Sequence, residues 1–376
     1  MLENSISGAL PIQKIQNLIQ TRSIIGVKED HPVQPSSIDL SISNEIYRMR
    51  GSFLPQKGES VRDILREGIL FPTSLDIPLE LQGIYLVRLQ ETLDLPVDIH
   101  AYANNKSSSG RINLQTRLIA DGVPQFDKIP PGYQGELWLE IIPKSFPVKL
   151  KTGEYLNQIR FFQGDARLSQ QEHFELHKTQ RLLYNIDGKP LPEETLIIDP
   201  DGLTTTIDLS SQQIIGFKST PTTCRLLDYT QRDLNPFDFF EPIYRPKNGQ
   251  VVMRRGEFYI FVTKEFLRVP LGFAMEITPY NPSSGEFRSH YAGFFDPGFG
   301  FGNKGEILGT PAVLEIFTYD NDFILRDGQS ICKIVYERLI EPSLISYGDP
   351  CLGSHYFNQR GPQLSKHFSM NKLLLN

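Results

Sequence analysis

The chain has 376 residues, of which 38 are basic and 44 are acidic, and its formal net charge is -6. This length suffices for two domains that each have a full core. The basic residues form no stripe, so we expect no nucleic-acid partner. The apolar runs are too short to span a membrane, and no basic region precedes an apolar one at the N-terminus. We therefore expect no membrane association and no signal peptide, and a cytoplasmic location.

The cysteines are far apart in the chain and odd in number: Cys224, Cys332 and Cys351. They can build neither a disulfide framework nor a CxxC metal site. The chain also carries 27 Pro and 29 Gly, distributed among short β-branched and aromatic runs. This composition is typical of an all-β protein with few helices.

The N-terminal part of the chain contains one helical and one strand pattern. Residues 9–22 place isoleucines and a leucine at helical spacing, which predicts one short helix. Residues 35–49 alternate, with Ile38, Leu40 and Ile42 on one face, and this predicts a strand with a single buried face. Residues 51–68 are interpreted as an insertion with some helical content.

Three blocks of sequence occur twice in the same order, with 80–99 matching 253–277, 103–141 matching 281–317, and 150–162 matching 325–337. Such a repeat predicts a tandem duplication of one domain. We expect a first domain at 1–170, a polar linker at 171–202, and a second domain at 203–376. The polar, aromatic end of the chain is either a disordered end or a flap over a site. We expect that its removal from Ser346 onward abolishes turnover and leaves the fold intact.

Each repeat has an apolar strand that carries one glutamate. In the first repeat, Leu137 and Leu139 should share one face, and Trp138 and Glu140 the other. The second repeat has Glu315 at the matching place. A carboxylate among apolar residues should have a raised pKa, which suits proton transfer near neutral pH. Alternatively, each glutamate pairs with an arginine of its own repeat and is purely structural.

Serines and cations precede this strand in both repeats. Residues 106–111, KSSSGR, could hold an anion with hydroxyl groups, backbone N–H groups and positive charge. Residues 283–288, SSGEFR, are the second copy. The alternative is a solvated turn. In the turns that follow, Tyr133 and Phe299 lie beside glycines, where an aromatic ring could stack on a base or cap the core.

These motifs together resemble the dCTP deaminases of the dUTPase-like superfamily, and most of all their tandem form. The resemblance rests on PSSIDLSISNEIYRM, KSSSGR, IPPGYQGELWLEI, LKTGEYLNQIRFF and HYFNQRGPQLS. It covers most of residues 10–165 and, more loosely, 240–365. It implies two distorted jelly-roll β-barrels and hydrolysis of dCTP to dUTP and ammonia. Because the family's sites lie between subunits of a trimer, it also implies a homotrimer.

The resemblance also assigns roles to residues. Glu140 and Glu315 would act as general base and acid, with Arg111 and Arg288 holding the carboxylate and water. The nucleotide would be bound by Lys106, Ser107, Ser108, Tyr133, Ser283, Ser284, Asp296, Tyr347, Tyr356 and Gln359. Mg²⁺ would be bound through the triphosphate, and no metal would be held by the protein for the deamination itself.

The sequence departs from the family pattern at several places. Lys106 replaces an arginine, Pro130 stands where the turn usually has aspartate, and His355 replaces a lysine. Glu140 follows Pro131 by nine residues, as in the family, whereas Glu315 follows Pro297 by eighteen. On this spacing we expect Glu140 to be the principal base.

Zinc-dependent cytosine deaminases carry an HxE…PCxxC signature. The sequence lacks the complete signature, so a deaminase built on this chain is expected to use a carboxylate without zinc. Two alternatives stay open. One is dUTP pyrophosphatase chemistry, alone or combined with deamination, because the turn IPPGYQGE resembles that of such enzymes. The other is a nucleotide-binding regulator that is not an enzyme.

Overall fold

The structure is a computed structural model that describes residues 7–68, 70–221, 224–278, 287–289, 293–354, 356–357 and 359–369. The chain divides into two compact units. Of the described residues, unit 1 holds those up to Asp165 together with the segments that end at Asn235 and Ser369. Unit 2 holds the rest.

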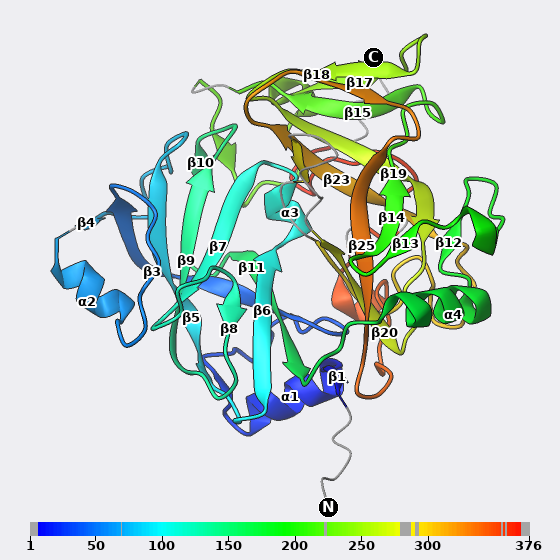
Figure 1. Ribbon diagram of the computed structural model, residues 1–376. Coiled ribbons are helices and arrows are strands. Elements are labelled where there is room, and N and C mark those ends of the chain that lie inside the picture. The colour runs from blue at the N-terminus through cyan, green and yellow to red at the C-terminus, as the bar shows by residue number, and fades with distance from the viewer. Residues whose placement is uncertain are drawn as a thin grey trace, which may run out of the picture. The chain divides into compact units, whose positions relative to one another are not determined.

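Unit 1 is built on a ten-stranded sheet whose main path runs β7-β9-β5-β3-β11-β6-β8 (Figure 1). β1, β2 and β4 pair with β11, β5 and β3. A two-stranded parallel sheet, β10-β16, completes the unit. The strands are β1 (Gly8–Ala9), β2 (Ile24–Ile25), β3 (Ile38–Met49), β4 (Leu70–Pro72), β5 (Ile84–Asp94), β6 (Ile99–Asn105), β7 (Leu114–Ala120), β8 (Lys128–Ile129), β9 (Gln134–Pro143), β10 (Val148–Lys149), β11 (Tyr155–Gln163) and β16 (Leu227–Asp228).

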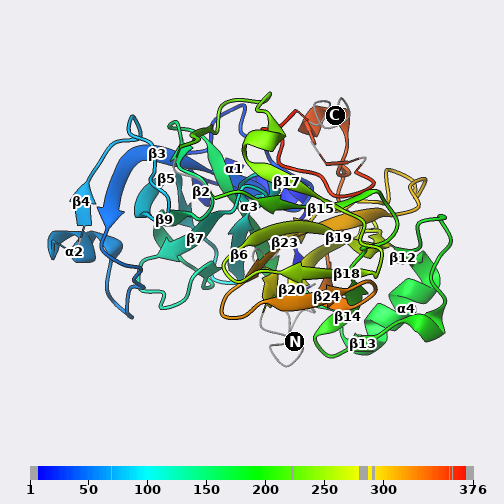
Figure 2. The ribbon, with the colours of Figure 1, turned by 90° about the horizontal axis from the view of Figure 1, so that it is seen from above.

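Unit 2 contains a six-stranded sheet, a five-stranded sheet and the ribbon β18-β24. Figure 2 shows β15, β19 and β23 of the six-stranded sheet side by side. The strands are β12 (Leu183–Tyr184), β13 (Ile198–Asp199), β14 (Gly202–Thr206), β15 (Ile214–Ser219), β17 (Phe240–Tyr244), β18 (Gln250–Met253), β19 (Phe258–Leu267), β20 (Phe273–Thr278), β21 (Phe287–Ser289), β22 (Phe294–Phe295), β23 (Thr310–Thr318), β24 (Phe323–Arg326) and β25 (Ser330–Arg338).

The α-helices in the described residues are few and short, which confirms the predicted all-β class. They are α1 (Ile12–Gln20), α2 (Val61–Arg66), α3 (Ser107–Gly110) and α4 (Gln170–Gln180), beside the 3₁₀ turns Glu193–Thr195, Pro236–Asp238 and Pro350–Leu352. α1 and α2 confirm the two helical patterns in the sequence. No helix among the described residues is long and apolar enough to cross a membrane.

The strand predicted within residues 35–49 is β3, but the prediction of a single buried face is wrong. The first half of β3 is buried on both faces. Its inward polar residues have partners. Ser41 donates from its backbone N–H and its hydroxyl group to the carboxylate of Glu91, at 2.9 and 2.6 Å. In unit 2, Thr206 donates to Glu265 in the same way, at 2.8 and 2.7 Å. In each unit a glutamate therefore joins two strands, Glu91 being buried and Glu265 partly buried, which the alternation of the sequence did not reveal.

The residues expected to form a linker, 171–202, instead belong to unit 2. α4 begins with a capping box, in which Ser169 and Glu172 satisfy each other's backbone N–H groups, and it buries His173, Leu176 and His177. A polar helix with buried histidines looks like a linker in composition alone. The predicted boundary at 203 also misses the segments ending at Asn235 and Ser369, which lie in unit 1.

Candidate active site

Glu140 lies on β9 with its side chain on the face away from Leu137 and Leu139, as the alternation predicted. Only 1% of its surface is exposed. Leu86 of β5 lies opposite it on one side and Arg117 of β7 on the other. Glu140 therefore lies on a strand that is paired on both sides, and its side chain is buried.

Polar contacts of Glu140 come from outside its own strand. The hydroxyl group of Ser52, in the insertion between β3 and α2, donates to the carboxylate. Burial raises the pKa of Glu140, while Ser52, Arg117 and Lys144 oppose that rise. A carboxyl group with a raised pKa exchanges its proton closer to neutral pH than an exposed one.

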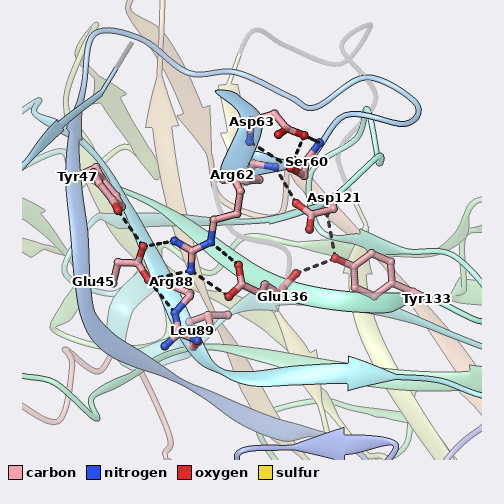
Figure 3. A network of polar contacts seen from close by, with 11 residues as sticks. Glu45, Tyr47, Ser60, Arg62, Asp63, Arg88, Leu89, Asp121, Tyr133 and Glu136 are labelled. Carbon is pink, nitrogen blue, oxygen red and sulfur yellow. Dashed lines mark hydrogen bonds and ion pairs between the residues drawn. The ribbon is translucent and has the colours of Figure 1, made fainter. Parts of the chain in front are cut away.

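The insertion is held against the sheet by an ion-pair network (Figure 3). Arg62 of α2 donates to both oxygens of Glu136, at 2.8 and 3.0 Å, and also pairs with Glu45. Its guanidinium lies 4.8 Å from the ring centroid of Trp138. Val61 joins Trp138 in one hydrophobic cluster. These contacts fix α2, and with it the segment that brings Ser52 to Glu140.

Tyr133 belongs to this network rather than to an open surface. It is 7% exposed. Its hydroxyl group accepts from the backbone N–H of Asp121 at 3.1 Å and donates to the carbonyl oxygen of Glu136 at 2.7 Å (Figure 3). Of the two roles that the sequence left open for this ring, the structure places it in the core-capping one.

The serine motif of unit 1 forms α3, a single turn. Lys106 pairs with the buried Asp39, and Ser107 is half-buried. Ser108, Ser109 and Arg111 are buried. The predicted anion cradle is thus a packed element in which Lys106 and Ser107 are the more exposed members.

Two segments distant in sequence complete this part of unit 1. The Tyr229 hydroxyl group lies 3.1 Å from that of Ser108, and the Ser365 hydroxyl group donates to the Ser108 carbonyl oxygen at 2.8 Å. Arg232 lies 3.0 Å from Nδ1 of His367. Burial, with help from the charges of Lys106 and Arg232, lowers the pKa of Lys366 to about 8. The sequence analysis missed these residues, because no local pattern links them to α3.

In unit 2, Glu315 occupies the position that corresponds to Glu140. It lies opposite Ile260 on β19, as Glu140 lies opposite Leu86 on β5, and it is 7% exposed. Hydrogen bonds of the preceding turns also correspond. Leu95 N–H donates to the carbonyl of Tyr133 at 2.9 Å, and Val269 N–H to that of Phe299 at 2.8 Å. The longer interval before Glu315 is therefore a loop between Phe299 and β23, and it leaves the strand register intact.

The second copy of the serine motif is described only in part. Ser283 and Ser284 lie outside the described residues. Arg288 is on β21, opposite Phe317, where unit 1 has Gln115 opposite Ile142. By register Arg288 corresponds to Gln115 rather than to Arg111. Asp296 is buried, and its carbonyl oxygen accepts from Phe299 N–H at 3.1 Å.

The C-terminal tail is packed rather than detachable. Tyr347 N–H donates to the carbonyl oxygen of Pro297 at 2.7 Å, and its ring lies 5.7 Å from that of Phe299. Tyr356 is buried, and Gln359 donates to the carbonyl oxygen of Pro311 at 2.8 Å. Further buried residues follow, namely Leu364, Ser365, His367 and Phe368. The expectation that the tail can be removed with the fold intact therefore needs correction.

A pocket of about 370 Å³ in unit 2 is lined by tail residues Phe357 and Arg360 together with Phe266, Leu308 and Thr310. Thr310 begins β23, five residues before Glu315, which is roughly 17 Å along a strand. The pocket is therefore distant from the carboxylate of this unit. Among the described residues, no group of three or more His, Cys, Asp or Glu side chains could hold a metal ion.

Comparison with known proteins agrees with the resemblance. Residues 6–165 match the family model of the 2'-deoxycytidine 5'-triphosphate deaminase (DCD) N-terminal domain, and residues 169–368 match that of its C-terminal domain. The chain is similar in structure to the crystal structure of 2'-deoxycytidine 5'-triphosphate deaminase from Agrobacterium tumefaciens. The TM-score is 0.80 and the identity 36%, over 90% of this chain and all of that one.

Two shorter relatives have different names. A Methanosphaera stadtmanae protein described as "dCTP deaminase, dUMP-forming" is 28% identical over 206 residues, which are 47% of this chain and 89% of the relative. A "Probable deoxyuridine 5'-triphosphate nucleotidohydrolase" of Sulfolobus islandicus rod-shaped virus 1 is 28% identical over 131 residues, 35% of this chain and 68% of the relative.

Proposed function

The chain belongs to the 2'-deoxycytidine 5'-triphosphate deaminase family, and from this premise we propose that it hydrolyses dCTP to dUTP and ammonia with Glu140 as the base. The single observation that carries the proposal is the buried carboxylate of Glu140. Its burial raises its pKa, while the hydroxyl group of Ser52 and the charges of Arg117 and Lys144 act on it in the opposite direction. Such a group is suited to take a proton from water and return it.

The reaction needs one water molecule and a proton path. Glu140 takes a proton from the water molecule while the water oxygen forms a bond to C4 of cytosine. Glu140 then passes this proton to N3. The tetrahedral intermediate then collapses, the C4–N4 bond breaks, and the amine leaves as ammonia after it gains the second proton of the water. Ser52 holds the carboxylate in place. Positive charge from Arg117 and Lys144 keeps the ionised form of Glu140 available.

We propose that the triphosphate binds at the basic end of unit 1. Lys106 and Ser107 belong to the motif that resembles the family's phosphate-binding residues. Arg232 and Lys366 add positive charge beside them, which favours an anion with several charges. Mg²⁺ would accompany the triphosphate, supplied with the nucleotide rather than held by a carboxylate cluster. We assign no zinc, because the sequence lacks the complete HxE…PCxxC signature.

A second candidate is a dUMP-forming deaminase, which also splits the triphosphate. The Methanosphaera stadtmanae relative, named as such, favours it. The experiment that separates the two incubates the purified chain with dCTP and Mg²⁺, measures released ammonia, and resolves the nucleotides by chromatography. The first proposal expects dUTP and ammonia in equal amounts without pyrophosphate. Equal amounts of dUMP, pyrophosphate and ammonia would favour the second, and no ammonia would contradict both.

We further infer that the two units descend from one duplicated domain, because Glu140 and Glu315, and likewise Glu91 and Glu265, occupy matching places. In a trimeric family, three chains would then supply six such domains. Light scattering is expected to give the mass of a homotrimer, and a monomer at micromolar concentration would contradict this assembly.

A further inference from the structure

The paired strands β7 and β9, with the loop that follows β7, bring a second buried carboxylate near Glu140. Arg117 lies directly opposite Glu140 in this pair of strands. The loop that follows β7 returns Asp127 to the same strand, where its carboxylate accepts from Leu118 N–H at 2.8 Å and from Nη1 of Arg117 at 2.8 Å. Asp127 is 3% exposed. Arg117 therefore pairs with one buried carboxylate and lies opposite the strand position of the other.

The charged groups around Glu140 come from several elements. β7 contributes Arg117, the residue after β9 contributes Lys144, and the loop before β8 contributes Asp127. β5 offers only the apolar Leu86 at this point, and the insertion offers the hydroxyl group of Ser52. The Arg62–Glu136 pair lies farther along β9, beyond Trp138.

The two carboxylates influence each other through the shared cation. Burial raises the pKa of Asp127 to about 6, Arg117 opposes that rise, and the negative charge of Glu140 adds to it. Arg117 also lowers the pKa of Glu140. Asp127 accepts from Nη1 of Arg117, and above pH 6, where Asp127 is charged, its charge offsets part of the charge of the guanidinium.

We propose that Arg117 and Asp127 are positioning residues for the deamination, Arg117 keeping Glu140 ionised and Asp127 limiting how strongly it does so. This inference rests on the proposed role of Glu140. It assigns a task to two side chains that the resemblance left without one. Arg117 is half-exposed, so its replacement creates no buried cavity.

The test is the pH profile of kcat/KM for dCTP, whose acidic limb reports the pKa of the base in the free enzyme. Arg117→Gln removes the cation and should move the limb to higher pH by about one unit. Asp127→Asn leaves the cation to Glu140 alone and should move the limb the opposite way. Arg117→Lys, which keeps the charge, should restore most of the original position. Substrate ionisation is common to all variants, so only differences between their profiles count.

The matched control is Arg48→Gln, which removes another arginine–carboxylate pair of the same sheet, that with Glu80. Its limb should stay where it is in the unmodified chain. If Arg117→Gln is folded and its limb does not move, or moves in the same direction as that of Asp127→Asn, the inference is overturned. Full activity of Glu140→Gln would instead overturn the proposed function, so the two failures are distinguishable.

Discussion

The hydroxyl group of Tyr229 lies 3.0 Å from that of Ser109, although 120 residues separate them in the chain. The same Tyr229 hydroxyl group also contacts Ser108. The serine motif of unit 1 therefore contacts a residue that lies outside the first repeat. Lys106 and Ser107 are the less buried residues of the motif.

Replacement of the proposed base should separate the two copies. Glu140→Gln keeps the size and hydrogen bonding of the side chain but removes the base, so kcat should fall by about a hundredfold or more. Glu315→Gln should cost less, because we assign the chemistry to Glu140. Ammonia release at saturating dCTP measures both, with circular dichroism as the check on folding. Loss of activity in Glu315→Gln, with Glu140→Gln nearly silent, would invert the assignment.

Tyr229→Phe should weaken unit 1. The change removes this partner from the hydroxyl groups of the buried Ser108 and Ser109, although Ser109 still donates to the carbonyl oxygen of Leu156. An unsatisfied buried polar group, as expected at Ser108, costs about 1–3 kcal/mol. Urea denaturation should therefore show a lower midpoint. Tyr244→Phe is the matched control, because Tyr244 is 60% exposed. Equal midpoints for the two variants would show that the contact with Tyr229 adds no stability.

Truncation of the tail should affect the fold as well as turnover. A chain that ends at Leu364 loses the buried Ser365, His367 and Phe368, together with the 4.3 Å ring contact between His367 and Tyr229. We expect faster limited proteolysis and loss of dCTP turnover. A chain that ends at Ser369 keeps these residues and should resemble the full chain. Wild-type protease resistance in the shorter variant would contradict the packed role of the tail.

The lowered pKa of Lys366 predicts that substrate affinity and stability change in opposite directions as the pH rises. Its pKa in the folded chain is about 8, against an ordinary value of 10.5. As pH rises through 8 the ammonium charge is lost, so KM for dCTP should increase. Between pH 8 and 10.5 the unfolded chain binds the proton and the folded chain does not, so the contribution of Lys366 to stability rises with pH.

Lys366→Gln should remove the part of the KM increase that is centred near pH 8. Steady-state kinetics from pH 7 to 9, with saturating Mg²⁺, measure it. Lys264→Gln is a suitable control, because that lysine pairs with Asp327 in unit 2. Identical KM profiles for Lys366→Gln and the unmodified chain would contradict the proposed contact with the triphosphate.

The sequence predicted what depends on local periodicity. Strand alternation put Leu139 and Glu140 on opposite faces, and the repeat located Glu315 in spite of the longer loop before it. Arg117 was missed because its position opposite Glu140 depends on the β7–β9 register, which the sequence of β7 does not reveal. Tyr229 and Lys366 were missed for a different reason. They reach α3 through long-range packing, and neither belongs to a repeated block.

The two segments that join unit 1 from later in the chain also determine when it can be completed during synthesis. A ribosome delivers the ten-stranded sheet first, whereas His367 and Phe368 are synthesised only after most of unit 2. Until then, Tyr229 lacks its ring contact with His367. Unit 1 therefore lacks its contacts with this last segment until most of unit 2 has been translated.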